Sequence, residues 1–259
     1  MIEVHNLTFG YSSTEDGQIL KGVDFAAKTG KLTALIGTNG AGKSTLLKTI
    51  MGILKGKGEI YVNGKPVSQY STKDFSSTVS YLSQDNDCKV NLSVFEVVML
   101  GRMGSMSFRV SDEDIAATQE VLERLNLQRF ASRSIMELSG GQRQLVFMAQ
   151  ALVKEPKILI LDEPTSALDL HKQFNLLTLL KSLTQENDFT TLVTLHHLDL
   201  AAMFADEIIV LKEGTVYAQG APKDIFTEAM MEDVYRVKTK IYMDDNGLPH
   251  VIPLEAIIN

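Results

Sequence analysis

Nine consecutive residues form a pattern typical of loops that bind nucleotide phosphates. They fill every fixed position of Gly-x-x-x-x-Gly-Lys-Ser: Gly37, Thr38, Asn39, Gly40, Ala41, Gly42, Lys43, Ser44 and Thr45. An apolar strand pattern at 32–36 precedes the loop, and a helical pattern at 44–51, closed by Gly52, follows it. Glycines let backbone N–H groups approach the β-phosphate, and a helix N-terminus favours an anion. Lys43 is therefore predicted to reach the β- and γ-phosphates, and the Ser44 hydroxyl to bind Mg²⁺. A simple glycine-rich turn is the alternative that this context disfavours.

Two acidic residues follow an apolar strand pattern in the second half of the chain. Residues 158–161 are Ile-Leu-Ile-Leu, and Asp162 and Glu163 come next. A charge in this place lies at the carboxyl edge of a sheet, where open α/β sheets bind ligands. Asp162 is predicted to hold Mg²⁺, and Glu163 to act on the attacking water as a general base. Taken alone, the pair could also be exposed acids at a strand end.

A third motif, Leu138-Ser139-Gly140-Gly141-Gln142, opens a helical pattern. It combines a hydroxyl group, two glycines and the first N–H groups of a helix, which together suit a second anion-binding site. Ser139 could equally be an ordinary helix N-cap, and both roles are compatible.

Composition narrows the class of protein. The chain has 259 residues, 25 basic and 32 acidic, with a formal net charge of −7 and no basic tract. That balance disfavours nucleic-acid binding. No apolar run approaches the roughly 18 to 20 residues that span a bilayer, and the N-terminus does not resemble a secretory signal. The single cysteine, Cys88, suits a reducing compartment. We expect a cytosolic chain that reaches a membrane only through a partner.

The hydrophobic patterns predict an α/β fold interrupted by a helical subdomain. A small antiparallel sheet is expected from strands at 2–9, 20–27 and 58–62, the last ending in an Asn63-Gly64 turn. Further strands are expected at 79–83, 157–162 and 190–195, and helices at 93–100, 111–125 and 141–153. Ser93 and Glu96 form a possible capping box for the first of these helices.

With these motifs in this order, the chain resembles the nucleotide-binding subunit of an ATP-binding cassette (ABC) transporter over essentially its whole length. The resemblance implies a P-loop NTPase core of ABC ATPase type, with an antiparallel β subdomain and an inserted helical subdomain. It implies one domain over 1–259, with the core at 1–83 and 154–259 and the helical part at 84–153. It also assigns further roles: Tyr11 stacks on adenine, Gln84 touches Mg²⁺ and the attacking water, Asp169 lies in the loop crossing a dimer interface, and His196 contacts the γ-phosphate.

Each of these added assignments has a plainer alternative. Tyr11 could be an exposed loop aromatic, and Gln84 a solvated turn residue. Asp169 could simply cap the helix that follows it. His196 could be an ordinary histidine at a strand end. The expected subfamily usually has Asp after the switch histidine, whereas this chain has His197.

The resemblance also implies partners and a cycle. ATP and Mg²⁺ bound at Lys43, Ser44, Gln84 and Asp162 would be covered by Ser139, Gly140, Gly141 and Gln142 of a second copy. A groove near Gln84 would accept a helix from an integral membrane permease, which works with an extracytoplasmic substrate-binding protein. The chain would then lie at the cytoplasmic face of the cell membrane, attached through the permease.

Three stretches, 93–102, 195–201 and 245–253, resemble importers of ferric siderophores, haem and cobalamin. Ferric siderophore is the expected cargo, with haem, cobalamin or a metal ion as alternatives. A soluble ABC ATPase without a transport role is the rival from another class. The motifs do not choose the cargo, because this kind of subunit does not touch it.

Overall fold

The computed structural model describes residues 1–12, 17–84, 91–102 and 110–258. The chain divides into two compact units, one made of Met1–Gln69 and Leu177–Asn259 and the other of Tyr70–Leu176. Helix α6 (Leu170–Glu186) contains the second boundary between them. The helical part predicted at 84–153 does not coincide with the second compact unit, Tyr70–Leu176, and its bounds stay a prediction.

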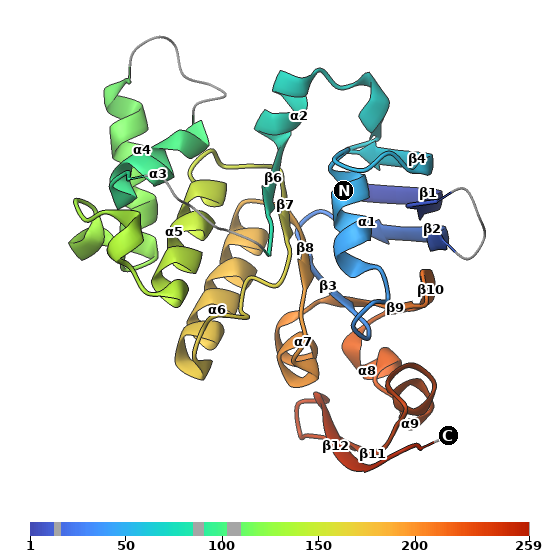
Figure 1. The fold of residues 1–259 in the computed structure, drawn as a ribbon. Coiled ribbons are helices and arrows are strands. Elements are labelled where there is room, and N and C mark those ends of the chain that lie inside the picture. Colours follow the sequence, from blue (N-terminus) through green and yellow to red (C-terminus); the bar gives the residue numbers. More distant parts are fainter. Residues whose placement is uncertain (13–16, 85–90, 103–109, 259) are drawn as a thin grey trace. The chain divides into compact units, whose positions relative to one another are not determined.

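The first unit contains the predicted antiparallel sheet. Its strands lie in the order β2-β1-β4-β5, with bounds β1 (Ile2–Gly10), β2 (Gln18–Ala27), β4 (Lys57–Val62) and β5 (Lys65–Pro66). Both β2 and β4 pair antiparallel with β1, and Figure 1 shows these strands beside α1 (Lys43–Ile50). The turn after β4 has positive φ at Asn63 and Gly64 (49° and 75°), which explains the Asn-Gly sequence there.

The same unit holds the strands that carry the phosphate loop. They are β3 (Leu32–Ile36), β8 (Thr190–Thr194), β9 (Glu207–Lys212) and β10 (Thr215–Gly220). Strand β3 runs parallel to both β8 and β9, and β10 returns antiparallel to β9. Every residue of β3 and β8 is buried, as strands covered on both faces require.

Beyond β10 the chain forms a C-terminal module, here defined as residues 222–256. Its elements are α8 (Pro222–Ile225), α9 (Glu228–Met230), a π-helical turn η6 (Met231–Tyr235), and the hairpin strands β11 (Val237–Met243) and β12 (Pro249–Ala256). Figure 1 shows the hairpin in red, next to α7 (Leu198–Phe204), against which β12 packs. The sequence pattern did not predict this hairpin.

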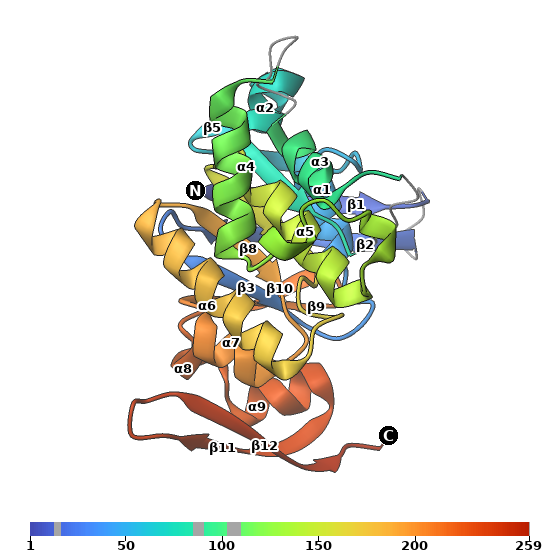
Figure 2. The same cartoon turned by 90° about the vertical axis from the view of Figure 1, so that its left-hand side faces the viewer.

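The second unit combines a parallel strand pair with a helical group. Strand β6 (Val79–Leu82) pairs parallel with β7 (Ile158–Leu161). The helices are α2 (Thr72–Thr78), α3 (Val94–Met99), α4 (Asp112–Arg124) and α5 (Gly140–Leu152), with 3₁₀ turns between them. Helices α3, α4 and α5 pack on one another, as Figure 2 shows.

Three helices of this unit begin with a reciprocal capping box. The N-cap residues are Ser93 for α3, Ser111 for α4 and Ser139 for α5, and each serine accepts a hydrogen bond from the backbone N–H three residues on. The side chain at that third position bonds back to the serine N–H in every case. The capping box predicted at Ser93 is therefore confirmed.

Candidate nucleotide-binding and hydrolysis site

The phosphate loop leaves β3 and enters α1 in the first unit. Asn39 and Gly40 lie exposed at its tip, whereas Lys43 is 7% exposed. The Lys43 ammonium donates hydrogen bonds to the carbonyl oxygens of Gly37 (2.7 Å) and Thr38 (3.0 Å). The lysine side chain thus lies against the loop that is predicted to bind the phosphates.

The start of α1 has the features of an anion site. Its N-cap is Gly42, with φ 101°, and no side chain caps the first N–H groups. A Cβ added to Gly40 would meet nothing within 4 Å, so the loop tip opens to space. Uncapped N–H groups at a helix start are suited to a phosphate. The loop therefore fits the triphosphate of a nucleotide, with Ser44 and Thr45 in the first turn of the helix.

His196 follows β8 in the same unit. Since β8 and β3 are parallel, with Thr194 opposite Leu35, His196 and Gly37 both follow the carboxyl ends of neighbouring strands. His196 is exposed, and His197 is the N-cap of α7 without a side-chain cap bond. The place of His196 directly after β8 is consistent with its predicted role as the switch histidine, and its contact with the γ-phosphate stays a prediction.

Tyr11 also belongs to this unit. Its side chain is 73% exposed and meets Phe9 edge-on, with ring centroids 5.0 Å apart. An exposed ring is available for stacking on a base, but it equally fits the plain alternative. The adenine contact stays a prediction.

The second unit brings Gln84 and Glu163 together. Leu82 and Leu161 are partners in the parallel pair of β6 and β7, so both polar residues follow the same sheet edge. The Gln84 Nε2 donates a hydrogen bond of 2.7 Å to Glu163 Oε2. Glu163 itself has φ 51°, the left-handed region that costs a non-glycine residue energy. Its carbonyl accepts bonds from the hydroxyl (3.0 Å) and N–H (3.3 Å) of Ser166, which hold that turn.

Asp162 lies immediately before Glu163 and is 1% exposed. Its backbone N–H donates to the Leu82 carbonyl (2.8 Å), which continues the β6–β7 ladder to this residue. The residues predicted to hold Mg²⁺, Ser44, Gln84 and Asp162, offer a hydroxyl, an amide oxygen and a carboxylate. These are hard oxygen donors of the kind that Mg²⁺ prefers. Among the described residues there is no cluster of three or more His, Cys, Asp or Glu side chains that could hold a metal ion.

The Ser-Gly-Gly-Gln motif forms the start of α5. The Ser139 Oγ accepts from Gln142 N (3.4 Å), and the Gln142 Oε1 accepts from Ser139 N (2.9 Å). The N-cap interpretation is therefore confirmed, and the anion-binding role stays open beside it. Gly141 is packed, since an added Cβ would lie 2.9 Å from the Ala167 carbonyl oxygen. Gly140 is exposed, with nothing within 4 Å of an added Cβ.

Asp169 caps α6, as its plain alternative proposed. Its Oδ1 accepts from the Lys172 backbone N–H (3.0 Å), and its Oδ2 accepts from the Lys172 ammonium (2.5 Å). The side-chain bond from Lys172 lowers the pKa of the Asp169 carboxyl. Its role at a dimer interface stays a prediction. Cys88 and the loop at 85–90 lie outside the described residues.

Sequence reasoning missed a contact that frames the phosphate loop. The Gly214 backbone N–H donates to the Ala41 carbonyl (3.1 Å) from the tight turn between β9 and β10. Glu213 and Gly214 both have positive φ there (48° and 84°). The signal was a glycine after the apolar run 208–211, which indicates a hairpin turn but not its contact with the loop.

Comparison with known proteins agrees with this geometry. The family model described as ABC transporter matches residues 20–166. The iron(3+)-hydroxamate import ATP-binding protein FhuC of Bacillus subtilis is 37% identical over 94% of this chain and 90% of its own. The ferric enterobactin transport ATP-binding protein FepC of Escherichia coli is 34% identical over 96% of this chain and 92% of its own.

A solved structure supports the fold independently. It is a dimeric ATP-binding cassette in a post-hydrolysis state, bound to ADP and Pi, with a TM-score of 0.77 and 30% identity over 86% of this chain and 99% of that one. None of the helices among the described residues is both long and apolar enough to cross a bilayer. With its phosphate loop, its strand-end carboxylates and these matches, the chain belongs to the ABC transporter family as an ATP-binding subunit.

Proposed function

We propose that the chain is the Mg²⁺-dependent ATPase that powers an ABC importer of ferric siderophores. The observation that carries the transport class is the match with FhuC over 94% of this chain. The observation that carries the chemistry is the Gln84–Glu163 hydrogen bond at the carboxyl edge of β6 and β7.

ATP binding follows from the phosphate loop. The uncapped start of α1 receives the phosphates, and Lys43 supplies a positive charge beside the carbonyls that now accept its hydrogen bonds. Ser44, Gln84 and Asp162 would hold Mg²⁺, which would neutralise negative charge on the bound phosphates. Tyr11 stacks on the adenine ring.

Glu163 is the general base of the hydrolysis. The Gln84 amide orients the Glu163 carboxylate, which accepts a proton from the attacking water. His196 contacts the γ-phosphate. A residue held in the left-handed region is positioned by its surroundings rather than by its own preference, as an oriented base requires.

The second nucleotide contact comes from another copy of the chain. Ser139, Gly140, Gly141 and Gln142 would close over ATP held by the partner, and the open space at Gly140 leaves room for the phosphate to approach the backbone. Asp169 lies near the same interface. The dimeric form of the similar cassette supports this arrangement.

Transport requires membrane partners. We propose that the chain attaches to integral permease subunits at the cytoplasmic face of the membrane, and that an extracytoplasmic binding protein selects the cargo. Two relatives named for iron(3+)-hydroxamate and ferric enterobactin support a ferric siderophore as the cargo class.

The biochemical test compares the purified wild type with Glu163→Gln. The wild type should hydrolyse ATP only with Mg²⁺, and the variant should bind ATP, lose steady turnover and form an ATP-dependent dimer on size exclusion. The amide keeps the shape of the side chain but is not a base. Near-normal turnover of the variant without a dimer would refute the assignment.

The cargo test is growth of a deletion strain on single sources of iron or metal. Growth on ferric siderophore should fail, while growth on haem, cobalamin or free metal salts should continue. A defect confined to zinc or manganese would refute the cargo and leave the ATPase assignment intact.

A further inference from the structure

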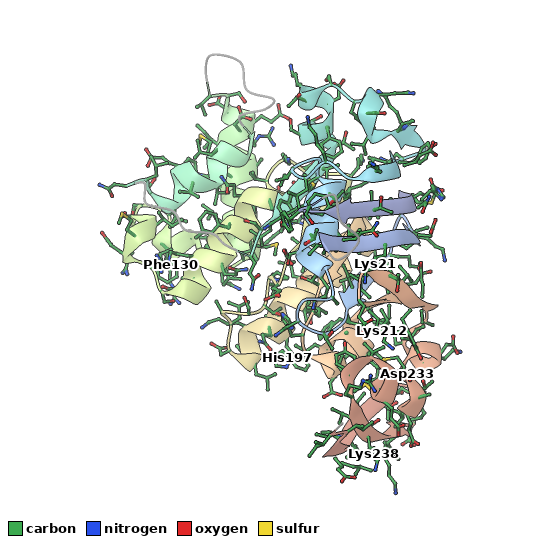
Figure 3. All side chains as sticks on the ribbon, turned by 45° about the vertical axis from the view of Figure 1, so that its right-hand side comes forward. Lys21, Phe130, His197, Lys212, Asp233 and Lys238 are labelled. Atoms are coloured by element: carbon green, nitrogen blue, oxygen red, sulfur yellow. The ribbon has the colours of Figure 1, made fainter. Side chains whose placement is uncertain are left out.

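A buried glutamine in the second unit holds the loop 164–168, which follows Glu163. Gln173 lies near the start of α6, whose side chains Figure 3 draws as sticks, and it is only 7% exposed. Its Nε2 donates hydrogen bonds to the carbonyl oxygens of Thr165 and Leu168, both at 3.1 Å. An amide nitrogen carries two hydrogens, so this single group serves both carbonyls. The side chain therefore bridges two points of the loop backbone.

The same loop determines the backbone of Glu163. The carbonyl of Glu163 accepts hydrogen bonds from the hydroxyl and the N–H of Ser166, and Ser166 lies between the two carbonyls that Gln173 holds. The φ of 51° at Glu163 is a strained value that persists only where the surroundings impose it. Gln173 is one of the contacts that fix the turn in which this strain is kept.

The loop also lies against the helix that carries the Ser-Gly-Gly-Gln motif. A Cβ added to Gly141 on α5 would lie 2.9 Å from the Ala167 carbonyl oxygen and 3.2 Å from Leu168 Cδ2. Glu163, the loop, Gln173 and this glycine all belong to the same compact unit. A change in the shape of the loop would therefore displace it relative to both Glu163 and the start of α5.

The residue type fits a role in holding the backbone. Burial of an amide group costs free energy unless its hydrogen bonds are made, and here both bonds from Nε2 go to the backbone of the loop. An apolar side chain of similar size could fill the same space, but it could not donate to Thr165 and Leu168. The glutamine thus contributes hydrogen bonds that packing alone would not supply.

We propose that Gln173 is a positioning residue for ATP hydrolysis, which holds the loop 164–168 in the shape that orients Glu163 and keeps the loop seated against Gly141. The inference rests on the proposed role of Glu163 as the general base. It assigns part of the turnover rate to a buried side chain that acts through the loop backbone.

The test uses Gln173→Met in the full chain, which keeps the length of the side chain and removes its donors. Steady ATP turnover with Mg²⁺ should fall about tenfold, because the base is less well oriented. Affinity for the fluorescent analogue mant-ATP should stay within about twofold of the wild type, since the phosphate loop is unchanged. Hydrogen exchange in the peptide covering 163–170 should become faster, and exchange in 43–50 should not change.

Thr184→Val is the matched control on the same helix. Thr184 is 1% exposed, and its hydroxyl donates to the Leu180 carbonyl (2.6 Å) and lies 2.6 Å from the Thr191 hydroxyl. The substitution also removes buried hydrogen bonds of α6, so it should lower Tm, but it should leave turnover within about twofold of the wild type. The comparison separates lost stability from lost positioning.

A second variant covers the case in which Gln173→Met does not fold. Gln173→Asn keeps the amide but is one methylene shorter, so turnover should fall in the same direction by a smaller factor. Turnover within about twofold of the wild type, in whichever variant folds, would overturn the inference. An equal loss of turnover in Thr184→Val would also overturn it, since that result indicates an effect of stability alone. Normal turnover of Gln173→Met beside an inactive Glu163→Gln would refute only this inference, whereas a wild type without Mg²⁺-dependent turnover would refute the proposed function.

Discussion

Ser139→Ala separates a helix cap from a residue that acts on a partner's nucleotide. Ser139 makes one capping bond, 3.4 Å long, to Gln142 N. Loss of such an N-cap costs about 0.5–1 kcal/mol, which in a chain of this size lowers Tm by roughly 1–4 °C. If Ser139 also donates to the transferring phosphate, steady ATP turnover should fall on the order of 100-fold.

Ser93→Ala is the matched control. Ser93 forms the same capping box at α3, with Oγ 3.2 Å from Glu96 N. Its replacement should lower Tm by a similar amount and leave turnover within about twofold of the wild type. Differential scanning fluorimetry and a coupled phosphate-release assay measure both quantities. Equal turnover in the two variants would refute the anion-binding role, and loss of ATP binding by the isolated Ser139→Ala monomer would refute action across the interface.

Three further predictions concern substitutions of single residues. Lys43→Ala should lose most ATP affinity, because it removes the only loop cation among the described residues 37–45; calorimetric titration that finds wild-type affinity would contradict this. The hydrogen bond from Arg102 lowers the pKa of Asp114 to about 2. The ionised carboxylate should therefore stabilise the fold above pH 4, and this contribution should disappear as the pH falls toward 2. The fall in Tm on acidification should be shallower in Asp114→Asn than in the wild type. Gly101→Ala should lower stability by about 2 kcal/mol, since its Cβ would lie 2.2 Å from the Gln150 carbonyl oxygen, whereas Gly140→Ala, with open space around it, should leave Tm nearly unchanged.

Local patterns predicted the elements that position the site. The helix expected at 44–51 is α1, and Gly52 follows its end with φ 69°, as a C-terminal glycine should. The polar start of the helix expected at 111–125 became the Ser111 capping box of α4. The apolar runs at 158–161 and 190–194 are β7 and β8, buried throughout. These features depend on a few neighbouring residues, so the sequence contains them.

Contacts between distant segments were beyond such patterns. The Gln84–Glu163 bond depends on β6 and β7 being adjacent and parallel, although 79 positions separate the two residues. The C-terminal hairpin has Pro249 and Pro253 in β12, which weaken its strand signal. The strand packs on α7, but only Pro249 is buried, so no alternating apolar pattern marks it in the sequence.

Uptake of radiolabelled ferric hydroxamate siderophore in the deletion strain tests the central claim most directly. Cells that carry the wild-type chain should recover uptake, and cells that carry Glu163→Gln at equal abundance should not, because the variant binds ATP without turnover. Equal uptake in both strains would contradict the claim that hydrolysis at Glu163 powers siderophore import.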